Sequence, residues 1–278
     1  MRFRPPKTRR VEFRRGSLLW LAGILFIAVP LLTLVDLPVA RFVLRHPMPR
    51  SVAETLDALA IYGQGTGTLA AIVAVAVLSR RRRWRVPRLA TMAAGGGAVA
   101  TVMKMFVLRP RPNELRIQSP SHDYAWAWSF DWTLEHIAAF DASTRAFPSA
   151  TVATAAALTV GFWVVVPKVR WIALLLCVAT IAQRIGHGAH FTSDVVGSAA
   201  IGLGWSFVCL SPRLMGGLFD RFEDGTRRKP HRADPSGEFD GGDRRRHPIL
   251  DEMGGRSAVV AGSTDVSESP TTTLKRAA

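Results

Sequence analysis

The chain has 278 residues, of which 48% are hydrophobic and 36 are Lys or Arg, and its formal net charge is +15. Such a charge on a soluble fold would suggest nucleic-acid binding, which requires a basic stripe on the protein surface. Here the apolar residues form long blocks and the basic residues cluster between them, a pattern typical of membrane proteins. We therefore exclude nucleic acid as a partner and predict a membrane protein.

Residues 1–16 are basic and precede a first apolar block from Ser17 to about Val35. A signal peptide has a similar start, but this block is long enough to span a bilayer. Because no clean small-residue cleavage site follows, we predict a retained first span. Residues 37–62 mix charged and apolar positions, which predicts one or two short amphipathic helices at the membrane interface.

Five further apolar blocks follow, and a polar, aromatic loop at 109–147 separates the second of them from the third. The glycine run Gly95–Gly97 predicts close helix contact. We predict an all-α fold, a polytopic membrane helical bundle of six transmembrane helices with short interfacial helices. The later blocks are Gly63–Ser79, Leu89–Leu108, Ser149–Val166, Trp171–Arg184 and Asp194–Leu210.

Three regions follow from this pattern: a basic N-terminus at 1–16, a six-span domain at 17–211 and a tail at 212–278. The tail is charged and rich in Gly, Pro, Ser and Thr, so we expect it to be disordered. Two cysteines, Cys177 and Cys209, lie in apolar blocks without a CxxC partner and are interpreted as small buried hydrophobes.

Orientation is predicted from the basic connections, because cytoplasmic loops carry an excess of Lys and Arg. The N-terminus, the 80–88 loop, the 167–170 turn and the tail fall on one side of a six-span arrangement. We expect that side to be cytoplasmic, in a multi-pass protein of the plasma (inner) membrane with both termini inside. The 109–147 loop and the 185–193 turn then lie on the extracytoplasmic face.

Ionisable residues at span ends indicate function, because charge within a membrane is costly. Lys104 and Arg111 are seven residues apart, and two helical turns place them on one face, about 10 Å apart along the axis. Two converging cations suit an anionic oxygen cluster. For this pair alone, snorkelling of both side chains to the interface is an equally good interpretation.

Two further polar sets lie at extracytoplasmic span ends. Pro148-Ser149-Ala150-Thr151 opens the fourth span, where free backbone N–H groups and a hydroxyl bind anions or simply cap a helix. In the second set, His190 and Asp194 are four residues apart, so on a helical turn the carboxylate would hold one imidazole nitrogen and leave the other reactive. A helix cap at Asp194 does not explain why Arg184 is there as well.

Together these sets resemble the type 2 phosphatidic acid phosphatase superfamily, which also contains vanadium haloperoxidases. The family pattern is Lys, six residues, Arg-Pro; then Pro-Ser-Gly-His; then Ser-Arg, five residues, His, three residues, Asp. The first and third motifs are matched by Lys104, Arg111-Pro112, Arg184, His190 and Asp194, with Gln183 in place of Ser. The resemblance covers roughly 58–211, and six spans favour the membrane phosphatases over the soluble haloperoxidases.

The resemblance implies a role for each matching residue. His190 would attack phosphorus and form a phosphohistidine, and Asp194 would orient it and stabilise its charge. The phosphoryl oxygens would be bound by Lys104, Arg111, Ser149, Ala150 and Arg184. Phosphoryl transfer mainly needs an aligned nucleophile and positive charge around the oxygens, so no metal or other cofactor is expected.

The second motif departs from the pattern, because Thr151 stands where the family has its general-acid histidine. A threonine hydroxyl does not protonate a leaving group near neutral pH, and general acid catalysis contributes about 10²–10⁴-fold. Three hypotheses follow: a leaving group that needs little protonation, another acid such as His187, His122 or His136, or a degenerate site with little turnover. For His187 a structural role is the simpler interpretation.

The sequence thus predicts a lipid phosphatase or diphosphatase acting at the extracytoplasmic face, with a lipid phosphate or diphosphate as substrate. A headgroup would reach the site while the tails stay in the bilayer, and Trp126, Trp128 and Trp132 are typical of an interfacial loop. The alternative is a degenerate phospholipid-binding, phosphotransfer or transport protein. The sequence does not indicate the oligomeric state.

Overall fold

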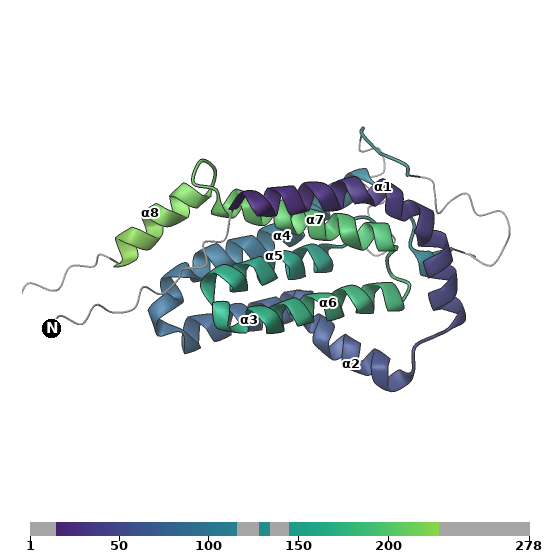
Figure 1. Cartoon of the computed structure of the whole chain (residues 1–278), viewed down its shortest axis with the longest axis horizontal. Helices are drawn as coiled ribbons and strands as arrows, with labels where there is room; N and C mark the ends of the chain where they lie inside the picture. Colours follow the sequence, from purple (N-terminus) through teal and green to yellow (C-terminus); the bar gives the residue numbers. More distant parts are fainter. Residues whose placement is uncertain (1–14, 116–127, 134–144, 228–278) are drawn as a thin grey trace, which may run out of the picture. The chain divides into compact units, whose positions relative to one another are not determined.

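The computed structural model describes residues 15–115, 128–133 and 145–227, and in these ranges the protein is built from helices. No extended sheet forms in the described segments; two isolated bridges pair Val107 with Phe130 and Pro110 with Arg145. The prediction of an all-α membrane helical bundle is confirmed. The helices are drawn in Figure 1.

The first helix is longer than its apolar block. Helix α1 runs from Arg15 to Arg45, 31 residues, which at 1.5 Å per residue is about 46 Å. The expected interfacial segment at 37–62 is therefore divided between the end of α1 and a separate amphipathic helix, α2 (Arg50–Ala60). The first apolar block is predicted to end at about Val35, just before Asp36. In the structure α1 continues past Asp36, which is almost completely buried inside the protein.

Among the described residues, four helical segments are long and apolar enough to cross a membrane. They are Gly16–Arg45 of α1, Arg82–Phe106 with α4 (Val86–Phe106), Pro167–Gly186 with α6 (Arg170–Gly186) and α7 (Thr192–Leu210). A fifth candidate is a bent pair in which α2 and the turn Ile61–Gly63 join α3 (Gly65–Leu78) at 61°. The short helix α5 (Ala150–Val165) has 16 residues, about 24 Å, less than a hydrocarbon core of about 30 Å. The expected count of six spans is thus not established.

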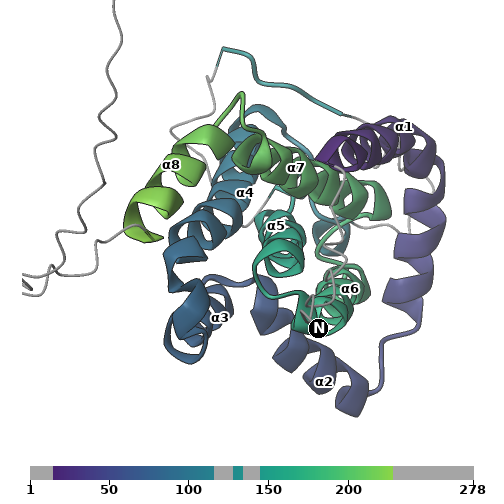
Figure 2. The same ribbon diagram turned by 60° about the vertical axis from the view of Figure 1, so that its left-hand side comes forward.

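Helix α5 is the centre of the bundle. It packs against α4, α6 and α7, and Figure 2 shows it enclosed by these helices and α3. Alanines and small polar residues let the neighbours come close: a Cβ on Gly96 of α4 would lie 2.9 Å from the Cβ of Ala157, and one on Gly202 of α7 would lie 2.4 Å from the carbonyl oxygen of Ala153. The close contact predicted for the glycine run is therefore present.

The two ends of the bundle have different polar groups. The end of α4, the starts of α5 and α7 and the end of α6 meet at one end, which we call the site end. The opposite end has the arginine-rich turn Arg80–Arg85, where Arg82 donates a hydrogen bond to the carbonyl of Val165. The predicted site residues of these helix ends and of the segments next to them lie at the site end, and none lies in that turn: Lys104, Ser149, Ala150, Thr151, Arg184, His190 and Asp194.

Residues 212–278 were expected to lack ordered structure, but Gly216–Arg227 form a helix, α8. Its Asp220 and Glu223 pair with the buried Arg88 of α4 at 2.5 and 2.8 Å. Phe219 of α8 packs against an apolar cluster that includes Leu18. The composition of the whole tail concealed this short amphipathic segment, whose stability comes from contacts with the bundle. Residues 228–278 lie outside the described part of the chain.

Candidate active site

His190 lies in the short connection between α6 and α7 and is 5% exposed. Its Nδ1 is 2.6 Å from the backbone carbonyl of Ala146. Because a carbonyl only accepts hydrogen bonds, Nδ1 must carry the proton, and the lone pair of the neutral ring is then on Nε2. Burial, followed by the positive charge of Lys104, lowers the pKa of His190 to about 3. The imidazole is therefore neutral at physiological pH.

The expected hydrogen bond between Asp194 and His190 is not formed. Helix α7 begins only at Thr192, so the spacing of four does not fall on a helical turn. Asp194 instead accepts a hydrogen bond from the backbone N–H of Phe191 at 2.8 Å, as the third residue of the helix capping its own start. Its other carboxylate oxygen accepts from Arg109. The orienting group of His190 is the Ala146 carbonyl.

A buried ionic cluster lies beneath this connection, and no sequence motif predicts it. Arg109 is fully buried and donates to Asp36 at 2.7 Å, to Asp194 and to the hydroxyl of Ser193 at 2.8 Å. Asp36 also accepts from the backbone N–H of Ser193 at 2.8 Å. Two carboxylates thus share one guanidinium, and the cluster ties α1 to the start of α7.

Aromatic rings enclose the same arginine. The guanidinium carbon of Arg109 lies 4.4 Å from the ring centroid of Trp128 and 4.3 Å from that of Phe191. Both rings exclude water from the cluster and add cation–π attraction. The available signals were Asp36, the one acidic residue between Ser17 and Ala53, and an arginine between two larger motifs. Neither residue belongs to a motif that predicts such a pair.

Three predicted cations act on one another electrostatically at the site end. Lys104, on the last turn of α4, is buried and lies within range of Arg111 and Arg184. All three also act on His190. A fourth, Arg145, donates to the carbonyls of Lys104 and Met105 at 3.1 and 2.8 Å, which closes the end of α4. Arg145 was not singled out from the sequence, because it stands alone in a polar loop.

The start of α5 supplies neutral donors. Ser149 is the residue before the helix, and its buried hydroxyl has no hydrogen-bond partner in the described segments. The first N–H groups of a helix, here from Ala150 onward, have no acceptor within the helix. The N–H of Ser149 itself donates to the Ser198 hydroxyl at 2.6 Å, which in turn donates to the carbonyl of Asp194 at 2.5 Å. This relay sets α5 against α7.

Thr151 contacts a cation of the site. Its hydroxyl oxygen accepts a hydrogen bond from Arg184 at 3.0 Å. The Nε of Arg184 is buried and has no partner among the described residues. The threonine thus holds the guanidinium in place, a different task from the proton donation expected of a histidine there.

His187 is directed toward α2. Its Nδ1 is 3.0 Å from the carbonyl of Gln183, and its Nε2 is 3.4 Å from Asp57. Gln183 also donates to Asp57, at 2.9 Å. His187 is exposed, so the structure does not give it a buried structural role. Its contacts are with Gln183 at the end of α6 and Asp57 of α2. His122 and His136 lie outside the described residues, as does Trp126.

A glycine with positive φ shapes the connection that carries His190. Gly188 has φ of 60°, a conformation that L side chains rarely adopt, and its carbonyl accepts from the N–H of Asn113 at 3.1 Å. That bond joins the His190 connection to the segment after Arg111. Within the described ranges, no group of three or more His, Cys, Asp or Glu side chains is placed to hold a metal ion.

Comparisons with known proteins give one family and one solved structure. The structure is a transmembrane PAP2-type phosphatidylglycerolphosphate phosphatase from Bacillus subtilis, 17% identical, with a TM-score of 0.48; the match covers 78% of this chain and 100% of that one. No curated protein matches significantly. The family model of the PAP2 superfamily matches residues 85–214, a range that holds α4 to α7 and every predicted site residue. Over this range, the chain is similar to the PAP2 superfamily.

Proposed function

We propose that this protein is an integral membrane phosphatase or diphosphatase that hydrolyses a lipid phosphate, with His190 as the nucleophile. One observation carries the proposal: the buried imidazole donates Nδ1–H to a backbone carbonyl beside three cations, which leaves the Nε2 lone pair for attack. A histidine with a purely structural role does not need a cationic site around it.

In the first step Nε2 attacks phosphorus, and the bond from phosphorus to the leaving oxygen breaks with its electron pair on that oxygen. The phosphohistidine then reacts with water, which releases inorganic phosphate and restores the imidazole. The carbonyl of Ala146 keeps its hydrogen bond to Nδ1–H in both steps. It supports the positive charge of the intermediate, the role that the family resemblance implies for Asp194.

Charge on the transferred phosphoryl group is met by Lys104, Arg111 and Arg184. Ser149 and the first N–H groups of α5 add neutral donors, and a phosphoryl oxygen would satisfy the Ser149 hydroxyl that now lacks a partner. Such preorganised donors contribute most where water is excluded. We assign Asp194 a positioning role: with Arg109 and Asp36 it fixes the start of α7 next to His190.

The leaving group is the point that decides the substrate class. Thr151 accepts a hydrogen bond from Arg184, and His187 is turned toward Asp57, so neither is placed as a proton donor. A leaving phosphate spreads its negative charge over several oxygens and departs without protonation more easily than an alkoxide. We therefore favour a lipid diphosphate over a lipid monophosphate.

The sidedness follows the basic residues. The arginine-rich turn and the basic connection at Lys168 lie at the end of the bundle opposite the site, and basic loops face the cytoplasm. We propose that the site is extracytoplasmic in the plasma membrane, with both termini in the cytoplasm. A substrate would then present its headgroup at the outer surface.

Thr151 also favours a second candidate, a degenerate protein that binds or transports phospholipid with little hydrolysis. A panel of lipid mono- and diphosphates separates the two, with released phosphate as the measurement. We expect the wild-type protein to release phosphate from lipid diphosphates and the His190→Ala variant to release none. If no lipid is hydrolysed while inorganic phosphate or vanadate still binds, the second candidate replaces the first.

A gain-of-function variant tests the account of the leaving group. Thr151→His supplies the missing acid, so hydrolysis of monophosphates should rise by up to about 10²-fold while diphosphate hydrolysis changes less. Thr151→Val is the matched control, because it removes the hydrogen bond to Arg184 without adding an acid. Equal behaviour of both variants on monophosphates would contradict the proposed limitation.

A further inference from the structure

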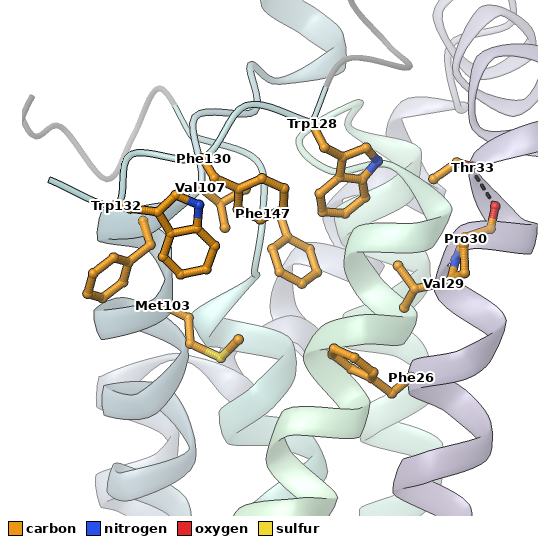
Figure 3. Close-up of a pocket in the computed structure, with 11 residues that line it drawn as sticks. Phe26, Val29, Pro30, Thr33, Met103, Val107, Trp128, Phe130, Trp132 and Phe147 are labelled. Atoms are coloured by element: carbon orange, nitrogen blue, oxygen red, sulfur yellow. Dashed lines mark hydrogen bonds between the residues drawn. The ribbon is translucent and has the colours of Figure 1, made fainter. Parts of the chain in front are cut away.

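An apolar pocket of about 670 Å³ opens beside the candidate site, within the range of about 300–1,000 Å³ typical of ligand sites. It lies between the middle of α1, the end of α4 and the segment Trp128–Trp132 (Figure 3). Its walls come from Val29 of α1, Met103 of α4 and Phe147, with aromatic side chains around them. None of the catalytic or phosphate-binding residues proposed above lines it.

The lining contains no charged residue. The hydroxyl of Thr33 donates to the carbonyl of Pro30 at 2.6 Å, the hydrogen bond drawn in Figure 3, so it does not require a polar ligand. The other polar atoms are the indole N–H groups of Trp128 and Trp132. A cavity with such walls favours a hydrocarbon and excludes a headgroup.

The pocket shares walls with the ionic groups of the site. Trp128 lines it and also covers the guanidinium of Arg109 at 4.4 Å. Phe147 packs edge-on against Trp128, with ring centroids 4.9 Å apart, and is two residues before Ser149. Met103 immediately precedes Lys104 in α4. A molecule whose phosphate is bound in the cationic site, formed by Lys104, Arg111 and Arg184, therefore has this apolar pocket next to it.

The pocket is also open to the surroundings of α1. Phe26, Phe130 and Trp132, all on its lining, are 55%, 49% and 74% exposed. Helix α1 is a candidate span whose outward side chains are mostly large hydrophobics, so those surroundings are bilayer. A chain can enter sideways from the membrane while its headgroup stays at the surface.

From these observations we propose that the pocket between α1, α4 and Trp128–Trp132 binds one hydrocarbon chain of the lipid whose phosphate occupies the cationic site. This inference rests on the proposed function. It adds the position of the hydrocarbon chain of the substrate, which lies on the α1 side of the site and away from α2. Moving a hydrocarbon chain from the bilayer into the pocket gains little free energy, because both surroundings are apolar. The pocket therefore acts by positioning: it holds the lipid so that its phosphorus faces Nε2 of His190.

Variants of two neighbouring residues test this. Met103→Trp fills the pocket, whereas Val102→Trp places the same ring on a position of α4 that is 54% exposed and outside the pocket. We expect Met103→Trp to lower kcat/KM for long-chain lipid phosphates by about tenfold to a hundredfold. Hydrolysis of short-chain, water-soluble analogues should be unchanged, and Val102→Trp should resemble the wild type with both substrates.

Photo-crosslinking of the wild-type protein gives a measurement that needs neither turnover nor a folded variant. Vesicles would contain a probe with a diazirine in its chain, either a polyprenyl diphosphate or a diacylglycerol phosphate, and the better-labelled probe identifies the chain type. We expect crosslinks at Val29, Met103 or Trp132 that inorganic vanadate reduces by displacing the headgroup.

The outcomes separate the two proposals. If the wild type hydrolyses no lipid but crosslinks in the pocket, the proposed function fails and the chain site stands. If Met103→Trp affects long and short substrates equally, or crosslinks fall only on outward positions of the spans, the pocket does not hold the chain. Crosslinking to a second copy of the protein at these positions would assign the pocket to a protein contact and overturn the inference.

Discussion

Two arginines two residues apart in the segment after α4 have opposite surroundings. Arg109 is fully buried and pairs with Asp36 and Asp194. Arg111 is partly exposed and lies among the cations that act on Lys104 and His190. The family pattern predicted the role of Arg111 by its spacing from Lys104. No spacing rule identifies Arg109, because its partners are 73 and 85 residues away in the sequence.

The pair predicts a division between stability and binding. Arg109→Met leaves two buried carboxylates without a counter-charge, so it should lower the free energy of unfolding by about 3–5 kcal/mol. Arg111→Met should change it by less than about 1 kcal/mol but weaken vanadate binding at least tenfold. Thermal unfolding in detergent and vanadate titration measure both. Arg109→Met with wild-type stability would mean that the buried cluster is not a structural tie.

The neutral state of His190 predicts a pH dependence. Its pKa is lowered to about 3, so the Nε2 lone pair stays available as the pH falls through 6.5, and protonation removes it only near 3. The profile of kcat/KM should therefore have no acidic limb near 6.5 from this residue. The substrate's own titration, followed by ³¹P NMR, is the control. An acidic limb near 6.5 that the substrate does not explain would show that the imidazole is not shielded.

At the scale of elements, hydropathy located the helices but not all their ends. Blocks and helices agree for α3 to α7 within a few residues, because long apolar runs dominate there. The end of α1 and the existence of α8 were missed, since each depends on a buried charge, Asp36 or Arg88, whose partner is remote in sequence. The start of α7 at Thr192 explains why the His190–Asp194 pair was wrongly expected to hydrogen-bond.

Two glycines of α7 allow a test of how closely α7 packs against α5. A Cβ at Gly202 would meet the carbonyl oxygen of Ala153 at 2.4 Å, whereas one at Gly204 would meet nothing within 4 Å. Gly202→Ala should therefore destabilise the protein by about 1–3 kcal/mol through overpacking. Gly204→Ala should be neutral or stabilising by up to about 1 kcal/mol, through helix propensity. Thermal unfolding of both variants is the measurement; equal melting temperatures would contradict the packing described for α5 and α7.

At the scale of the molecule, we propose that the site and the basic connections lie on opposite faces of the membrane. Glu114→Cys lies at the site end and Arg83→Cys at the other, and both parent side chains are exposed. An impermeant maleimide should label Glu114→Cys in intact cells and Arg83→Cys only after permeabilisation. The native Cys177 and Cys209 are buried and give little background. The reverse labelling pattern would place the site in the cytoplasm.

Sequence alone predicted the helical bundle and the similarity to the PAP2 superfamily. Most of the candidate site residues could also be proposed from it, because the motifs are spaced along span ends that the bundle brings together. The sequence does not predict the hydrogen bond between His190 and the carbonyl of Ala146, because every residue type has a backbone carbonyl. Nor did it indicate the pocket, whose lining combines α1 with a loop across about a hundred residues. Tertiary packing, not local pattern, determines these features.

Trapping the phosphoenzyme tests the central claim most directly. Purified protein would be mixed with a lipid diphosphate carrying ³²P on its terminal phosphate, quenched in alkali, digested and mapped. A phosphohistidine survives alkali and is hydrolysed in acid. We therefore predict an acid-labile ³²P label on His190. The label should also be found in the Val102→Trp variant and should be absent from His190→Ala. Steady hydrolysis with no labelled enzyme, or with the label on another residue, would contradict it.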